Sequence, residues 1–125
     1  MKITKKNGEW VIIIKAISRM AEEKVTLPAK VGYLFTKNKL AISAALEAYE
    51  EERKKIISKY SDGGENLTVN KNDDPDKFNE VINAFNEIAD IETEIEITPV
   101  SLDALEGRDI PMSVMLDLDC MFKED

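Results

Sequence analysis

The chain of 125 residues has 43% hydrophobic and 34% charged residues, one cysteine and no histidine, a composition that is ordinary for a globular protein and predicts one domain over residues 1–125. The missing histidine excludes Ser-His-Asp and Cys-His triads and imidazole metal sites, and no apolar run reaches the roughly 18 residues of a membrane span. The net charge of −8 divides unevenly, because residues 1–60 carry 13 basic and 7 acidic side chains whereas residues 61–125 carry 4 and 18. We expect the two halves to attract each other, and the acidic total argues against direct binding to nucleic acid.

The first segment allows two interpretations. Its first residues fit a short strand, and Asn7-Gly8 before a β-branched run would fit a hairpin over residues 1–14. A helix over residues 9–23 explains more of the pattern, because the apolar residues keep a helical spacing beyond the β-branched run. The expected apolar face of this helix consists of Trp10, Ile13, Ile14, Ile17, Met20 and Ala21.

The longest element is predicted over residues 28–60, with Thr26 as its cap and Pro28 in its first turn. Its apolar seam repeats every seven residues and would face one partner along roughly 45 Å at about 1.5 Å per residue. The short connection to the preceding helix predicts an antiparallel helical hairpin. The seam consists of Phe35, Ile42, Tyr49 and Ile56.

A polar loop is predicted over residues 61–74, after which Asp74 and Pro75 can begin a third helix over residues 75–91. The apolar stripe of this helix is expected to pack on the helical hairpin. The stripe consists of Phe78, Val81, Ile82, Phe85, Ile88 and Ala89.

Residues 93–98 alternate between apolar and polar side chains, which predicts a strand with one exposed face. Its expected partner is either residues 67–69 or residues 1–4. Ser101 can cap a single helical turn, and Pro111 can open a last short helix that is rich in methionine. The predicted fold class is therefore α+β and mainly α, with a helical hairpin, a third packing helix and a small sheet.

The acidic residues of the second half do not form a recognisable metal site. A calcium loop over residues 70–81 would need Gly at its sixth position and Glu at its twelfth, where this chain has Pro75 and Val81. Carboxylate pairs such as Asp117 and Asp119 lack a third element to complete a magnesium site. We expect no enzyme activity, no catalytic residue, no metal, no cofactor and no small-molecule substrate.

The chain enters its long helix with LPAKVGYLFTKNKLAIS, continues as LEAYEEERKKIISKY, and resumes after the loop with FNEVINAFNEIADIETEIEITPVSLDALEG. In this order of segments, which covers most of residues 27–107, the chain resembles a family of short uncharacterised tailed-phage and prophage proteins with a long central helix. The resemblance implies a phage or prophage origin, a place in the host cytoplasm and a role among head or tail assembly proteins. It implies no catalytic motif. The single cysteine, Cys120, fits a reducing, cytoplasmic compartment.

The half of the long helix beyond Tyr49 is predicted to be uncovered, because the first and third helices are each shorter than the seam. Pairing two such halves antiparallel would bring the acidic residues 50–52 of one copy towards the basic residues 53–55 of the other, which predicts a homodimer. The predicted interface consists of Tyr49, Arg53, Ile56, Ile57 and Tyr60.

Two functions follow from these features. The first is a non-enzymatic phage-type interaction protein that assists or joins a head or tail assembly through its long helix. The alternative is an acidic inhibitor that mimics nucleic acid and occupies a host DNA-binding enzyme, for which the carboxylates of residues 61–125 would have to share one exposed face.

Overall fold

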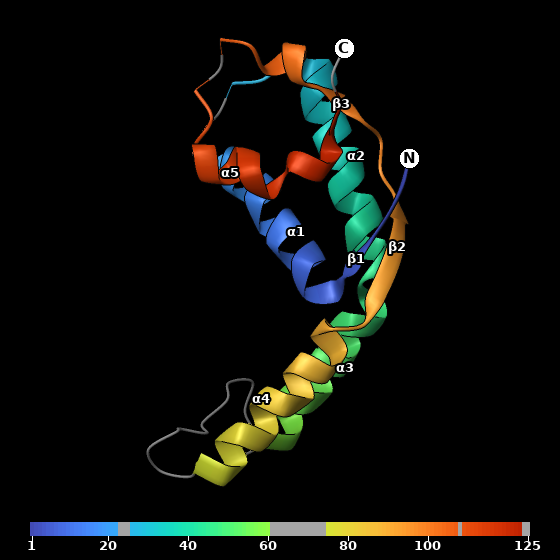
Figure 1. Cartoon of the computed structure of the whole chain (residues 1–125), viewed down its shortest axis with the longest axis vertical. Coiled ribbons are helices and arrows are strands. Elements are labelled where there is room, and N and C mark those ends of the chain that lie inside the picture. Colours follow the sequence, from blue (N-terminus) through green and yellow to red (C-terminus); the bar gives the residue numbers. More distant parts are fainter. Residues whose placement is uncertain (23–25, 61–74, 108, 124–125) are drawn as a thin grey trace.

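The computed structural model describes residues 1–22, 26–60, 75–107 and 109–123. Within them the fold is mainly helical with two small sheets, as the sequence predicts. Two helices, α3 and α4, project as an arm from a body that holds the other elements (Figure 1). In chain order the elements are β1 (Lys2–Lys6), α1 (Asn7–Glu22), α2 (Ala29–Ala45), α3 (Glu47–Tyr60), α4 (Pro75–Ala89), β2 (Glu92–Glu96), β3 (Val100–Ser101), the 3-10 helix η1 (Leu102–Leu105), α5 (Met112–Asp117), the 3-10 helix η2 (Asp119–Met121) and β4 (Phe122–Lys123).

The first segment forms helix α1, which confirms the helical interpretation and excludes the hairpin over residues 1–14. It begins two residues earlier than predicted, directly after β1, so that Asn7-Gly8 is the first part of the helix and not a turn. The Lys6 amide donates to the Glu9 carboxylate at 3.2 Å, a contact of the kind that satisfies free amides at helix starts. Most of the predicted apolar face is buried, with the Trp10 side chain fully inaccessible.

Strand β2 pairs antiparallel with β1, which confirms the second of its two predicted partners. Ile3 lies opposite Ile95, and their face of the sheet packs on the core. On the other face Lys2 lies opposite Glu96 and Lys6 opposite Glu92, so opposite charges meet across the ladder. The other predicted partner, residues 67–69, lies outside the described residues.

Helices α2 and α3 together occupy the region predicted as one helix, but the helix is interrupted at Leu46. This residue has φ −93° and ψ 8°. The interruption is one residue long, since the Leu46 amide still donates to the Ile42 carbonyl at 3.0 Å and the Glu50 amide donates to the Leu46 carbonyl at 2.9 Å. The Leu46 side chain is buried in the core, so the interruption coincides with the place where the helix leaves the body.

Helix α4 packs on one member of the predicted hairpin, because it runs beside α3, the second half of the predicted long helix, for the length of the arm (Figure 1). Only its end reaches α1, where a Cβ on Gly8 would lie 3.5 Å from the Ala89 Cβ. The predicted packing on the hairpin is therefore correct for the long helix, but α4 does not lie along the first helix, because an apolar stripe indicates that a face is buried without indicating which element covers it.

The last elements close the body around the start of α2. Strands β3 and β4 pair in parallel, and the Phe122 ring meets the Phe35 ring edge-on with centroids 6.3 Å apart. Pro28, and not the predicted Thr26, is the N-cap of α2. Ser101 is the N-cap of η1 as predicted, but its side chain makes no capping hydrogen bond. The predicted cap Asp74 lies outside the described residues.

Candidate functional site

The five predicted interface residues lie on α3, and α4 covers part of their surface. Tyr60 is buried, Tyr49, Ile56 and Ile57 are half-buried, and Arg53 is exposed. The expectation that this half of the seam is uncovered is therefore wrong on the side that faces α4. The structure brings the five residues together along one helix but turns the seam towards its own chain.

The charged residues that were expected to pair between two copies already pair within α3. Arg53 Nη1 lies 3.8 Å from a Glu50 carboxylate oxygen, and Lys55 Nζ lies 3.0 Å from Glu52 Oε1. Both pairs are solvent-exposed and join residues one turn apart, so each contributes little to stability. They do not prevent another contact, but they weaken the argument for pairing two copies through these residues.

The far end of the arm is held by a polar contact between its two helices. The Tyr60 hydroxyl is hydrogen-bonded to the Glu80 carboxylate of α4, and this bond raises the pKa of Tyr60 above its ordinary value of 10.0. The Lys59 ammonium lies 5.3 Å from the centroid of the Tyr60 ring. The bond fixes how the end of α3 meets α4.

The arm leaves apolar side chains incompletely covered. Among its described residues only Tyr60 and Val81 are buried, and Ile82 is 40% exposed. A pair of helices has no second layer, so the wide apolar stripe of α4 cannot be buried by α3 alone. The half-buried apolar residues of the pair are Tyr49, Ile56, Ile57, Phe78, Phe85 and Ile88.

The opposite side of the long helix carries a row that the sequence analysis did not single out. Tyr33 and Leu40 are each 65% exposed, and Lys37 and Ala44 between and beyond them are exposed as well. We name these four residues the outward row of α2. The sequence does indicate this row, because Tyr33 and Leu40 are seven residues apart. It was overlooked because the seam on the other side of the helix has more apolar residues with the same spacing.

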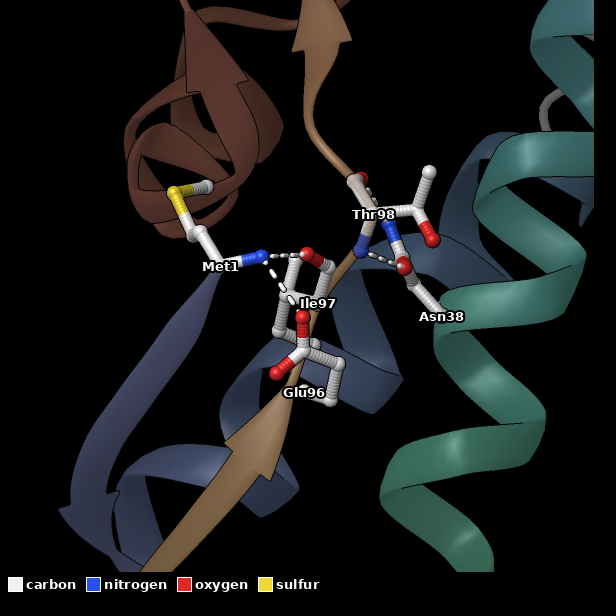
Figure 2. A network of polar contacts seen from close by, with 5 residues as sticks. All are labelled: Met1, Asn38, Glu96, Ile97 and Thr98. Atoms are coloured by element: carbon white, nitrogen blue, oxygen red, sulfur yellow. Dashed lines mark hydrogen bonds and ion pairs between the residues drawn. The ribbon is translucent and has the colours of Figure 1, made fainter.

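Buried asparagines join the elements of the body. The Asn38 carboxamide accepts from the Thr98 amide at 2.8 Å and donates to the Thr98 carbonyl at 3.0 Å. On the other side of the same segment the Met1 ammonium donates to the Ile97 carbonyl and to Glu96, both at 2.9 Å (Figure 2). The segment that follows β2 is thus held from both sides.

Asn7 has a similar role at the other end of β2. Its amide donates to the Ile91 carbonyl at 2.9 Å, its side chain donates to the Ile88 carbonyl at 3.1 Å, and its side-chain oxygen accepts from the Thr93 hydroxyl at 2.6 Å. The Trp10 indole N–H donates to the Thr93 carbonyl at 2.9 Å. These contacts tie the end of the arm to the body and are structural, because both asparagines have all their polar atoms satisfied.

Two clefts of modest size open on the body. One, of about 270 Å³, lies between α1 and α2, and the other, of about 300 Å³, lies where α2 meets β3. Neither of the two is lined by an acidic side chain or a cysteine, and the described part of the chain contains no group of three Cys, Asp or Glu side chains that could hold a metal. The first cleft is lined by Ile17, Met20, Ala21, Leu27, Gly32, Phe35 and Thr36, and the second by Lys30, Val31, Leu34, Pro99, Val100, Ser101, Ala104 and Lys123.

Comparisons with known proteins add no relative to this description. No protein-family model, no curated protein and no solved structure matches the chain. Among the residues that the structure describes, no helix has the length and apolar character needed to cross a membrane.

Proposed function

We propose that this chain is a non-enzymatic interaction protein of the phage or prophage type, which joins or assists an assembly in the host cytoplasm through its arm. The observation that carries the proposal is the incomplete burial of the arm: two helices project from the body, and most of their apolar side chains are only half-buried by the described part of the chain. Exposed apolar surface on a projecting element is typical of a protein-binding site.

The body supports this division of roles. It holds nearly all of the buried core, which extends from Trp10 to Met121 and includes both sheets. Each of its buried asparagines is committed to main-chain groups of the same chain. The body therefore holds the core, and the arm carries half-buried apolar side chains that a partner can cover.

The acidic-mimic alternative has less support from the described residues. The acids of β2 alternate along one exposed face, but Lys2 and Lys6 of β1 lie opposite two of them. A face of mixed charge does not present the continuous negative potential of a nucleic acid backbone. The alternative is retained as an outcome of the experiment below.

Site-specific photo-crosslinking tests the proposal. A photoreactive amino acid replaces Ile82 on the arm, and the chain is expressed in the infected or lysogenic host. We expect crosslinks to a protein from the same phage's assembly genes. The matched control carries the same amino acid at Lys15, an exposed position of α1 on the body, and should give none. Crosslinking at position 82 to a host DNA-binding enzyme would favour the alternative, and equal crosslinking at both positions would contradict a role for the arm.

A further inference from the structure

We infer that the outward row of α2 and its continuation on α3 bind a second copy of this chain in an antiparallel pair centred on Ala44. The inference rests on the proposed function in that the long helix serves as an interaction element, but it uses the face that α4 does not cover. It replaces the pairing through Tyr49, Ile56 and Tyr60, whose surface α4 partly occupies.

The row continues across the interruption at Leu46. Because the main-chain hydrogen bonds on both sides of Leu46 are kept, the helical spacing carries over from α2 into α3. The spacing of three and four residues places Ala48, Glu51 and Lys55 in line with the outward row. All three are exposed. From Tyr33 to Lys55 the line is roughly 33 Å long at about 1.5 Å per residue.

The line is self-complementary when it is reversed about Ala44. Lys37 then meets Glu51 of the second copy, Leu40 meets Ala48, and Ala44 meets itself. Tyr33 meets Lys55, whose ammonium is paired with Glu52, so this outer contact uses the apolar stem of the Lys55 side chain. A two-fold axis at Ala44 makes each of these contacts occur twice, as expected for an isologous dimer.

Charge excludes the parallel arrangement. Helix α2 carries Lys30, Lys37 and Lys39 and no acidic residue, whereas α3 opens with four glutamates in its first six residues. Parallel pairing would place lysine against lysine and glutamate against glutamate, and the antiparallel register removes both repulsions. In the described part of the chain neither Lys37 nor Glu51 has an oppositely charged atom within 4.0 Å, so both are available to a second copy.

The contact at the centre can be close. Ala44, Ala45 and Ala48 are exposed and small, and small side chains allow two helices to approach each other. Leu40 of each copy then packs on the alanines of the other copy. The pairing would bury Leu40 and Tyr33, which are the two most exposed large apolar residues of α2. The occupant of this face is thus a second copy, whose charges and side-chain sizes match it position by position.

Charge reversal tests the register. Sedimentation of the unchanged chain at concentrations of about 100 μM should show a dimer. Lys37→Glu alone and Glu51→Lys alone should each shift the mass to that of a monomer. An equimolar mixture of the two variants should recover the dimer, because the two like-charge pairs of each variant homodimer are replaced by two opposite-charge pairs in the mixed dimer. Both positions are exposed, so circular dichroism should show unchanged folding.

Matched controls and a crosslink complete the test. Lys15→Glu on α1 and Glu87→Lys on α4 change charge equally at exposed sites away from the row and should leave the dimer intact. With Cys120→Ser, an Ala44→Cys chain should oxidise to a disulfide-linked dimer. A monomeric unchanged chain, or a mixture that stays monomeric, would overturn the inference. If a monomeric chain still crosslinks from position 82 to a phage protein, the proposed function is supported and only this dimer is ruled out. If the chain is a dimer but position 82 gives no such crosslink, the dimer is supported and the proposed function is contradicted.

Discussion

At the scale of single residues, the fold depends on a few polar side chains that bind the main chain of distant elements. Asn38, 1% exposed, takes the place of a strand partner for Thr98, whose amide and carbonyl would otherwise lie unpaired beside the core. The side-chain nitrogen Nδ2 of Asn38 also lies 3.7 Å from the Met121 sulfur. One residue therefore connects α2, the segment after β2 and the end of the chain.

Replacing Asn38 should be costly. In Asn38→Ala both main-chain groups of Thr98 lose their partner, and at about 1–3 kcal/mol for each unsatisfied buried group we expect a loss of about 3 kcal/mol in the free energy of unfolding. Urea unfolding followed by Trp10 fluorescence measures this change. Ser43→Ala, an exposed site on the same helix, is the control and should change stability by less than about 0.5 kcal/mol. Equal values for the two variants would contradict the role of Asn38.

The Tyr60–Glu80 bond predicts a pH dependence. Because this hydrogen bond raises the pKa of Tyr60 above 10.0, the neutral hydroxyl is favoured in the folded state. The bond therefore stabilises the fold at all pH values below about 10, and its contribution is lost as the pH rises through the raised pKa. Glu80→Gln should lower the pKa of Tyr60.

Absorbance titration of tyrosinate checks this prediction in a chain with Tyr33→Phe and Tyr49→Phe, so that Tyr60 gives the whole signal. Glu87→Gln, an exposed carboxylate on the same helix, is the matched control. An unchanged titration midpoint in Glu80→Gln would show that the bond is absent in solution.

Single-residue roles were mostly beyond prediction from the sequence. Asn7 was considered only as part of a turn in the hairpin alternative, and Asn38 was not singled out, because nothing in local spacing shows a bond to a residue more than fifty positions away. The five interface residues were grouped correctly on one helix. The sequence did not predict that α4 would cover part of these residues, because the position of α4 depends on contacts between distant segments.

At the scale of elements, the arm and the body differ in how they are stabilised. Periodicity predicted α1, α4 and the long helix well, because burial on one side of a helix leaves a clear spacing of apolar residues. It did not predict the interruption at Leu46, where the chain has neither glycine nor proline. That position is set by packing, since Leu46 is buried where α2 ends and α3 begins.

The arm should open separately from the body. Val81 is the buried residue of α4, and Val81→Ala removes two methyl groups at a cost of about 2 kcal/mol. Hydrogen exchange of α3 and α4 amides should then become roughly 30-fold faster, while α1 amides keep their rate.

Ile82→Ala serves as the control, since Ile82 is adjacent on α4 but 40% exposed and should change exchange much less. If Val81→Ala accelerated exchange in α1 as strongly as in α4, the arm and the body would form one cooperative unit.

At the scale of the whole molecule, the fold is closed by strands that are far apart in the sequence. Strand β1 pairs with β2, and β3 pairs with β4. The helices α1, α2, α3 and α4 all lie between the members of the first pair along the chain. Contacts between residues that are far apart in the sequence slow folding, so we expect this chain to fold more slowly than a helical bundle.

Deleting residues 1–6 should abolish the folded state, because it removes β1 and exposes Ile95 and the surroundings of Trp10. We expect the fluorescence of the single tryptophan to shift to longer wavelength and the cooperative urea transition to disappear. The control chain keeps β1 but carries Lys2→Ser and Lys6→Ser, which removes only exposed charges opposite β2 and should unfold cooperatively. A truncated chain with unchanged tryptophan emission would contradict the prediction.

The pairing of β1 with β2 also has a consequence for the order of events during synthesis. A ribosome delivers Lys2–Lys6 first, but the partner Glu92–Glu96 follows only after four helices have been made. Until then the Trp10 indole lacks Thr93, and Asn38 lacks Thr98. Helices can form on the emerging chain, yet the core cannot close around them. The apolar faces of the earlier helices therefore stay open until β2 has emerged from the ribosome and can pair with β1.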